Sequence, residues 1–84
     1  MSYGVVFDEE AIIFLERLPK EIRRRIYERI ISTKENPFHF FERLEGRKDF
    51  KLRIGHYRAI ADIDAEKIRI TLIGHRKNVY KKIR

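Results

Sequence analysis

The stretch DFKLRIGHYRAIADI, residues 49–63, alternates apolar and polar side chains on both sides of a Gly-His pair. This period of two predicts two β-strands joined by a two-residue turn at Gly55 and His56. The apolar face would carry Phe50, Leu52, Ile54, Tyr57, Ala59, Ala61 and Ile63. Counting back from the turn places Arg53 directly opposite Arg58, where like charges repel each other. We interpret the charged face of this hairpin as a surface that binds an anion.

The composition bounds the architecture and the chemistry. The 84 residues predict a single domain spanning residues 1–84, near the lower size limit for one hydrophobic core. Cysteine is absent and the histidines have no metal-ligand spacing, so we expect neither a metal nor another cofactor. The amino terminus does not resemble a signal peptide, and no apolar run is long enough to span a membrane. We therefore expect a cytoplasmic protein without membrane association.

The charge of the chain is strongly positive. Twenty Lys and Arg residues against 13 Asp and Glu give a formal net charge of +7. Such a balance is typical of proteins that bind polyanions. It suits a nucleic acid, and it suits an acidic protein partner equally well.

The remaining pattern predicts an α+β fold with the order β-α-α-β-β-β. A helix hairpin would pack on one face of a small, mainly antiparallel sheet. Asp8 is the expected N-cap of the first helix, and Pro19 separates the two helices because proline cannot continue a helix but can open one. The expected elements are a strand at 3–7, helices at 8–18 and 19–36, and strands at 50–54, 57–64 and 67–75. Residues 38–49 are interpreted as a connection whose aromatic side chains close one end of the core.

The register of the last two strands decides which side chains share the charged face. A two-residue turn at 65–66 would pair Ile60 with Thr71 and direct Leu72 toward the helices. It would also place His75 opposite His56. The outer face of the sheet would then be polar and basic, with cations at Lys51, Arg53, Arg58 and Arg69. The segment GHRKNVY, residues 74–80, would bring Arg76 to the same surface.

Cations that converge from separate strands suit a phosphodiester. A guanidinium can hold a phosphate through two parallel hydrogen bonds. Cleavage of RNA by its own 2′-hydroxyl needs a base for that hydroxyl, positive charge near the phosphorane and an acid for the leaving 5′-oxygen. This chemistry requires no metal.

The element order, the segment LEGRKDFKLRIGHYRAIADI (residues 44–63) and the segment GHRKNVY resemble the RelE toxins of toxin–antitoxin pairs. The resemblance covers nearly the whole chain. It implies a RelE-like fold and a metal-independent endoribonuclease that cleaves messenger RNA in the ribosomal A site by 2′-hydroxyl attack, which inhibits translation. It also implies three partners: the ribosome, messenger RNA and an acidic RelB-like antitoxin.

The resemblance assigns roles to individual residues. Lys51 would be a proton acceptor or charge stabiliser, and Arg58 would hold the phosphate. Arg76 would stabilise charge or act as the acid near the leaving group, and Tyr80 would stack on a base and transfer a proton. Further contacts to RNA phosphates would come from Arg47, Lys48, Arg53, Arg69, His75 and Lys77.

Two alternatives stay open at the level of the sequence. One is a ParE-like toxin with the same fold, which inhibits DNA gyrase by binding and has no catalytic residues. The other is an inactive homologue that serves as a binding module. Asp49 stands where well-known RelE toxins carry a lysine, and the segment after His75 is shorter than in some of them.

Overall fold

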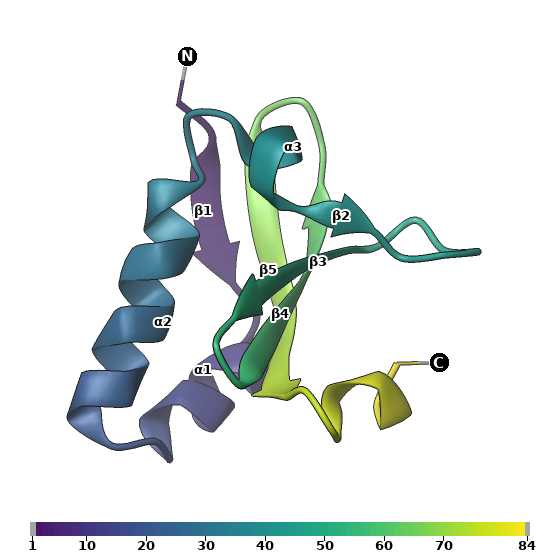
Figure 1. Ribbon diagram of the computed structural model, residues 1–84. Helices are drawn as coiled ribbons and strands as arrows, with labels where there is room; N and C mark the ends of the chain where they lie inside the picture. The colour runs from purple at the N-terminus through teal and green to yellow at the C-terminus, as the bar shows by residue number, and fades with distance from the viewer. Residues whose placement is uncertain (1, 84) are drawn as a thin grey trace.

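The computed structural model describes residues 2–83 and confirms the α+β fold (Figure 1). The predicted order β-α-α-β-β-β is present, and two short elements are added between the second helix and the hairpin. The elements are β1 (Gly4–Phe7), α1 (Glu9–Glu16), α2 (Lys20–Ser32), α3 (Pro37–Phe40), β2 (Glu42–Arg43), β3 (Phe50–Ile54), β4 (Tyr57–Ile63), β5 (Lys67–His75) and a 3-10 turn, η1 (Val79–Lys81). Within residues 2–83, no helix is long and apolar enough to cross a membrane.

The five strands form one sheet in the order β1-β5-β4-β3-β2. β1 pairs with β5 in parallel, and the other pairs are antiparallel. The hairpin has the predicted register, with Ile54 opposite Tyr57 and Arg53 opposite Arg58. Gly55 adopts a φ of 59°, a left-handed conformation that glycine tolerates best. The alternation in residues 49–63 therefore determines the centre of the sheet.

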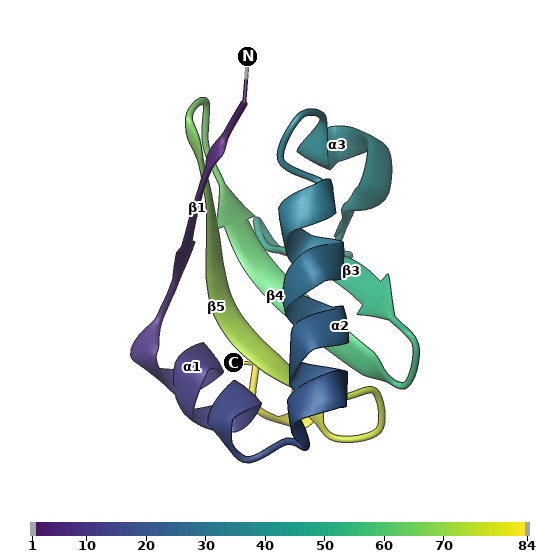
Figure 2. The ribbon, with the colours of Figure 1, turned by 90° about the vertical axis from the view of Figure 1, so that its left-hand side faces the viewer.

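The helices α1 and α2 cover one face of the sheet, and α2 runs along its length (Figure 2). Apolar residues spaced four apart, Ile26 and Ile30, put both side chains on the inner face of α2, where they are fully buried. The same core contains the inward residues of the hairpin and of β5, including Leu52, Ala59 and Ile70. This core lies on one face of the sheet, and part of the opposite face stays accessible.

The segment expected to be a plain connection contains α3 and β2. Pro37 is the first residue of α3, and the two residues of β2 pair with β3. The expectation that its aromatic residues close the core holds in part. Phe41 is buried, whereas Phe38 and Phe40 are exposed, although the Phe38 ring lies edge-on to the Phe50 ring at 5.5 Å.

The turn between β4 and β5 has the predicted two central residues. The backbone N–H of Asp64 donates to Lys67, and the Asp64 carboxylate accepts from the N–H groups of Glu66 and Lys67 at 2.7 Å each. These bonds lower the pKa of Asp64 below its ordinary value of 3.8, the bond from Glu66 contributing most. Asp62 lies opposite Arg69, which is the register that a two-residue turn at 65–66 gives.

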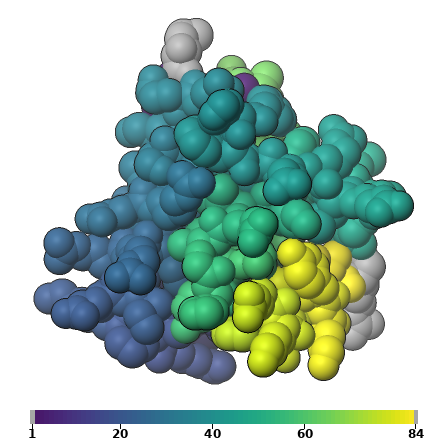
Figure 3. Space-filling view, viewed as in Figure 1, coloured from purple at the N-terminus to yellow at the C-terminus, as the bar shows by residue number. Residues whose placement is uncertain are grey.

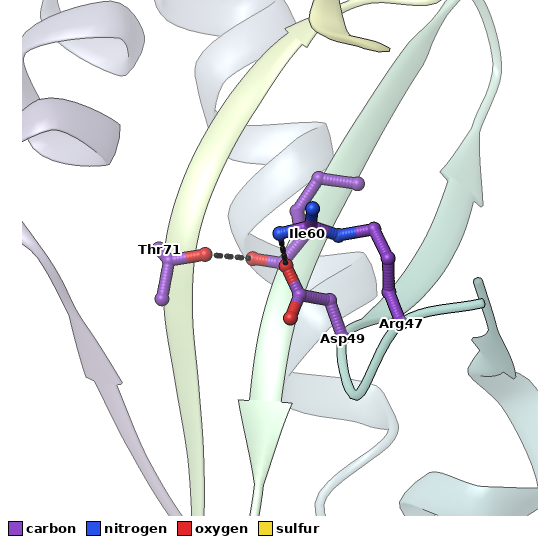
Figure 4. A network of polar contacts seen from close by, with 4 residues as sticks. All are labelled: Arg47, Asp49, Ile60 and Thr71. Carbon is purple, nitrogen blue, oxygen red and sulfur yellow. Dashed lines mark hydrogen bonds and ion pairs between the residues drawn. The ribbon is translucent and has the colours of Figure 1, made fainter. Parts of the chain in front are cut away.

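A β-bulge at Thr71 makes the predicted register wrong for the rest of β5. Ala61 pairs with Ile70, but Ile60 pairs with Leu72, so β5 contains one extra residue. The Thr71 hydroxyl donates to the Ile60 carbonyl at 3.3 Å (Figure 4). The extra residue inverts the facing of the strand beyond it, since side chains alternate with a period of two. His75 therefore lies opposite Tyr57 and not opposite His56.

The outer face of the sheet is consequently not polar throughout. Leu72, predicted to face the helices, instead joins Ile60 and Val79 in a second apolar cluster, with Leu44 and Ile83 packed against it. We call Ile60, Leu72 and Val79 the outer cluster. It is buried because the chain folds back over the sheet after β5 and covers it. The outer cluster anchors the C-terminal segment beside the cations of the hairpin.

Candidate functional site

The outer face carries an open hollow of about 510 Å³ next to the outer cluster. Seven side chains from β2, β3, β4 and the segment after β5 line it, and they are Glu42, Lys51, Arg53, Arg58, Arg76, Lys77 and Tyr80. In Figure 3 the C-terminal segment, in yellow, lies against the green part of the chain that contains the hairpin. The structure brings together all four residues to which the RelE-like resemblance assigns catalytic roles: Lys51, Arg58, Arg76 and Tyr80.

The hairpin supplies the floor of the hollow. Lys51 and Arg53 alternate with inward residues of β3 and so point outward together, and Arg58 joins them from β4. Arg53 is exposed, while Arg58 is only 8 % exposed. The opposed arginines therefore differ, since one is held in the structure and the other stands in solvent.

Two backbone carbonyls fix the guanidinium of Arg58. Its Nη1 donates to Gly55 at 2.9 Å and to Tyr57 at 2.8 Å, both at the hairpin turn. Arginine has five N–H groups. The two on Nη1 serve the turn, and the three on Nη2 and Nε take no part in these bonds. The turn thus orients the guanidinium before any ligand arrives.

The segment after β5 forms the wall of the hollow. The N–H of Arg76 donates to the His56 carbonyl at 2.8 Å, and the N–H of Asn78 donates to the His75 carbonyl at 2.8 Å. These bonds turn the chain so that Arg76 and Lys77 border the hollow and Tyr80 returns to it. Tyr80 is 41 % exposed, so part of its side chain is accessible from solvent.

Four of the predicted phosphate contacts, Arg47, Lys48, Arg69 and His75, do not line the hollow. The Arg69 guanidinium lies 3.4 Å from the Asp8 carboxylate. Asp8 is the N-cap residue of α1, but its side chain makes no capping hydrogen bond. The guanidinium of Arg47 lies 3.0 Å from the Asp49 carboxylate. Figure 4 draws this ion pair, in which the carboxylate at position 49 has a cation beside it.

His75 lies on the other face of the sheet, beside Tyr57. Its ring is 5.8 Å from the Tyr57 ring and stacked at 6.3 Å on His56. Its Nδ1 accepts the N–H of Lys77 at 3.2 Å, which helps to shape the start of the wall. The bulge at Thr71 accounts for this placement, because it inverted the facing of the residues that follow.

Glu42 is the residue that the sequence analysis missed. Among residues 2–83 it is the one carboxylate that lines the hollow, against five cations, and it lies opposite Lys51 in the β2–β3 pair. A strand of two residues shows no alternation, so the sequence predicts only a connection here. The one available signal was the apolar residue directly before it, Phe41, whose buried side chain anchors the segment to the core.

The sequence itself matches a known family. A model of the ParE toxin of type II toxin–antitoxin systems, parDE, matches residues 5–80. The chain therefore belongs to this family of type II toxins. A comparison with curated proteins gives no match.

Solved structures place the chain among RelE-like toxins. The structure of the RelBE2 toxin–antitoxin complex from Mycobacterium tuberculosis contains a chain that is 27% identical, with a TM-score of 0.80, covering 90% of this chain and 100% of that one. The RelE–RelB complex from Pyrococcus horikoshii is also 27% identical, with a TM-score of 0.75 and coverage of 90% and 97%. The isolated Escherichia coli RelE toxin, 21% identical over 88% and 84% with a TM-score of 0.72, shares the fold. The RelE-like resemblance seen in the sequence is confirmed.

Proposed function

We propose that this toxin is a metal-independent endoribonuclease that cleaves messenger RNA in the A site of the ribosome. The observation that carries the proposal is the convergence of five cations, a tyrosine and a carboxylate around one hollow. The hollow is open, which suits one stretch of an RNA strand better than an enclosed small molecule. Its residues match the base, the cations and the acid that 2′-hydroxyl attack requires.

The scissile phosphate would bind between Arg58 and its neighbours. Arg58 offers rigidly held N–H groups, since its guanidinium is tied to the turn. Arg53 and Lys51 add positive charge from the same face of the sheet. Fixed cations stabilise the extra charge of the phosphorane at little reorganisation cost, which is the largest contribution that such a site can make.

Two proton transfers complete the reaction. We assign Glu42 to accept the proton of the 2′-hydroxyl, because it is the carboxylate of the hollow, and Lys51 opposite it to stabilise charge. The 2′-oxygen then bonds to phosphorus, and the bond to the 5′-oxygen breaks. Arg76 or Tyr80 donates the proton to that oxygen, leaving a 2′,3′-cyclic phosphate and a 5′-hydroxyl.

An acidic RelB-like antitoxin is the proposed protein partner. The relatives from M. tuberculosis and P. horikoshii were solved in complexes with antitoxins. The net charge of +7 favours an acidic chain that would cover the cations and orders itself on binding.

Single-turnover cleavage on programmed ribosomes tests the proposed reaction. Replacing Arg76 or Glu42 with alanine should slow cleavage by about 10²-fold or more, as the loss of one preorganised group does. Arg24→Ala is the control, because Arg24 is an exposed helix arginine paired with Glu28 far from the hollow. If Arg76→Ala cleaves at the wild-type rate, the proposal that the hollow is catalytic is wrong.

The family match supports a second candidate, inhibition of DNA gyrase, since the matching model describes a ParE toxin. In that case the cations would serve binding and not catalysis. Pulse labelling after induction separates the two, because a ribonuclease stops protein synthesis first and a gyrase inhibitor stops DNA synthesis first. An induced chain that stops neither would be an inactive homologue.

A further inference from the structure

Gly74 lies where the C-terminal segment crosses back over the sheet. It is a buried residue of β5 and pairs with Arg58. A Cβ atom at this position would lie 3.1 Å from Cβ, 3.3 Å from Cγ2 and 3.4 Å from Cα of Val79. Gly74 is not among the glycines with positive φ, so its backbone would accept any residue. Glycine is needed here for space, because another backbone approaches the strand.

Val79 has little freedom to move away. It is fully buried in the outer cluster against Ile60 and Leu72. Its β-branched side chain is stiff, so a new contact would displace the main chain rather than turn the side chain. Val79 also begins η1, where its carbonyl accepts the N–H of Lys82 at 3.2 Å. A push on Val79 therefore moves the whole turn.

The contact between Gly74 and Val79 closes a small loop that carries the wall of the hollow. Arg76 and Lys77 lie inside the loop, and Tyr80 follows it directly. All three line the hollow. Their positions relative to the hairpin thus depend on how closely Val79 approaches the strand.

We propose that Gly74 is a positioning residue of the site. Its missing side chain lets Val79 rest on the sheet, and this contact fixes where Arg76, Lys77 and Tyr80 stand relative to Arg58. The effect on cleavage rests on the proposed function, while the effect on the placement of Val79 does not. A Cβ at position 74 would require Val79 to shift by a few tenths of an ångström. Because a displacement of about 1 Å in a catalytic site can cost about 10²-fold in rate, we expect this smaller shift to cost about tenfold.

The test compares Gly74→Ala with Gly4→Ala. Gly4 is also a strand glycine, but a Cβ there would meet no atom closer than 3.8 Å, which is ordinary contact. Nuclear Overhauser contacts between the Val79 methyls and the Leu72 side chain report the placement of Val79. Gly74→Ala should weaken these contacts and slow cleavage at saturating ribosomes by about tenfold or more. The ribosome concentration at half-maximal rate should stay within about twofold, because many phosphate contacts remain. Gly4→Ala should match the wild type in all three.

A second variant approaches the same contact from the other side. Val79→Ala adds no atom and removes the two methyls that hold the turn on the outer cluster, so it should slow cleavage without a clash. If Gly74→Ala does not fold, the cleavage rate of Val79→Ala tests the proposal instead. Wild-type contacts and wild-type cleavage in Gly74→Ala would overturn the proposal, and so would weakened contacts with unchanged cleavage. If the wild type itself does not cleave, the proposed function is wrong, and the Overhauser contacts alone decide whether Gly74 seats Val79.

Discussion

At the scale of single residues, Arg53 and Arg58 show how the same residue type takes two roles. The cross-strand opposition alone predicts that removing either arginine relieves repulsion. The structure changes this expectation for Arg58, because it is buried and donates to two carbonyls. Arg53 is exposed.

We therefore expect opposite effects on stability from the two alanine variants. Arg53→Ala should leave the free energy of unfolding unchanged or raise it by about 0.2–1 kcal/mol, because it removes a like charge. Arg58→Ala should lower it by about 1–3 kcal/mol, because carbonyls of the turn lose their donors. Urea unfolding of both variants checks this. A stabilised Arg58→Ala would mean that the carbonyl bonds contribute less than the repulsion costs.

At the scale of elements, β5 joins the two faces of the sheet. Before Thr71 it follows the simple alternation, and Ile68 and Ile70 enter the main core. After the bulge, Leu72 turns to the outer cluster and Gly74 leaves room for Val79. The helix α2 contrasts with β5, because the regular spacing of its apolar residues is enough to predict its buried face.

The buried face of α2 provides a stability test. Ile26→Ala should lower the free energy of unfolding by about 2–5 kcal/mol, the cost of a cavity in a packed core. Ile12→Ala, at a residue of α1 that is 42 % exposed, should change it by no more than about 0.5 kcal/mol. Thermal melts compare the two. Equal midpoints would show that the inner face of α2 is assigned wrongly.

At the scale of the whole molecule, positive charge and large apolar side chains are both exposed to solvent. The chain carries +7 and also exposes large apolar side chains on the first two helices, among them Ile12, Ile13 and Tyr27. For an acidic partner that binds both kinds of surface, apolar contacts would contribute most of the affinity, and charge would raise the association rate.

The salt dependence of antitoxin binding follows from this division. Raising salt from about 0.05 M to about 0.5 M should slow association by tenfold or more, because screening removes long-range attraction. Dissociation should change by much less, since buried apolar contacts are not screened. Stopped-flow or surface-binding kinetics measure both rates. A dissociation rate that rises as steeply as association falls would show that charge alone holds the complex.

The sequence by itself determined the strands of the hairpin, their register and the opposition of Arg53 and Arg58, because strict alternation and a glycine turn leave one arrangement. It also determined the buried stripe of α2, and it indicated Lys51, Arg76 and Tyr80 as candidate site residues. The tertiary structure alone decided where β5 changes face, because a bulge at Thr71 has no local signature and depends on pairing with β4. It likewise decided the place of Glu42, whose strand is too short to show a period. The close approach of Val79 to Gly74 depends on segments that meet only when the C-terminal chain folds back, so no local pattern could encode it.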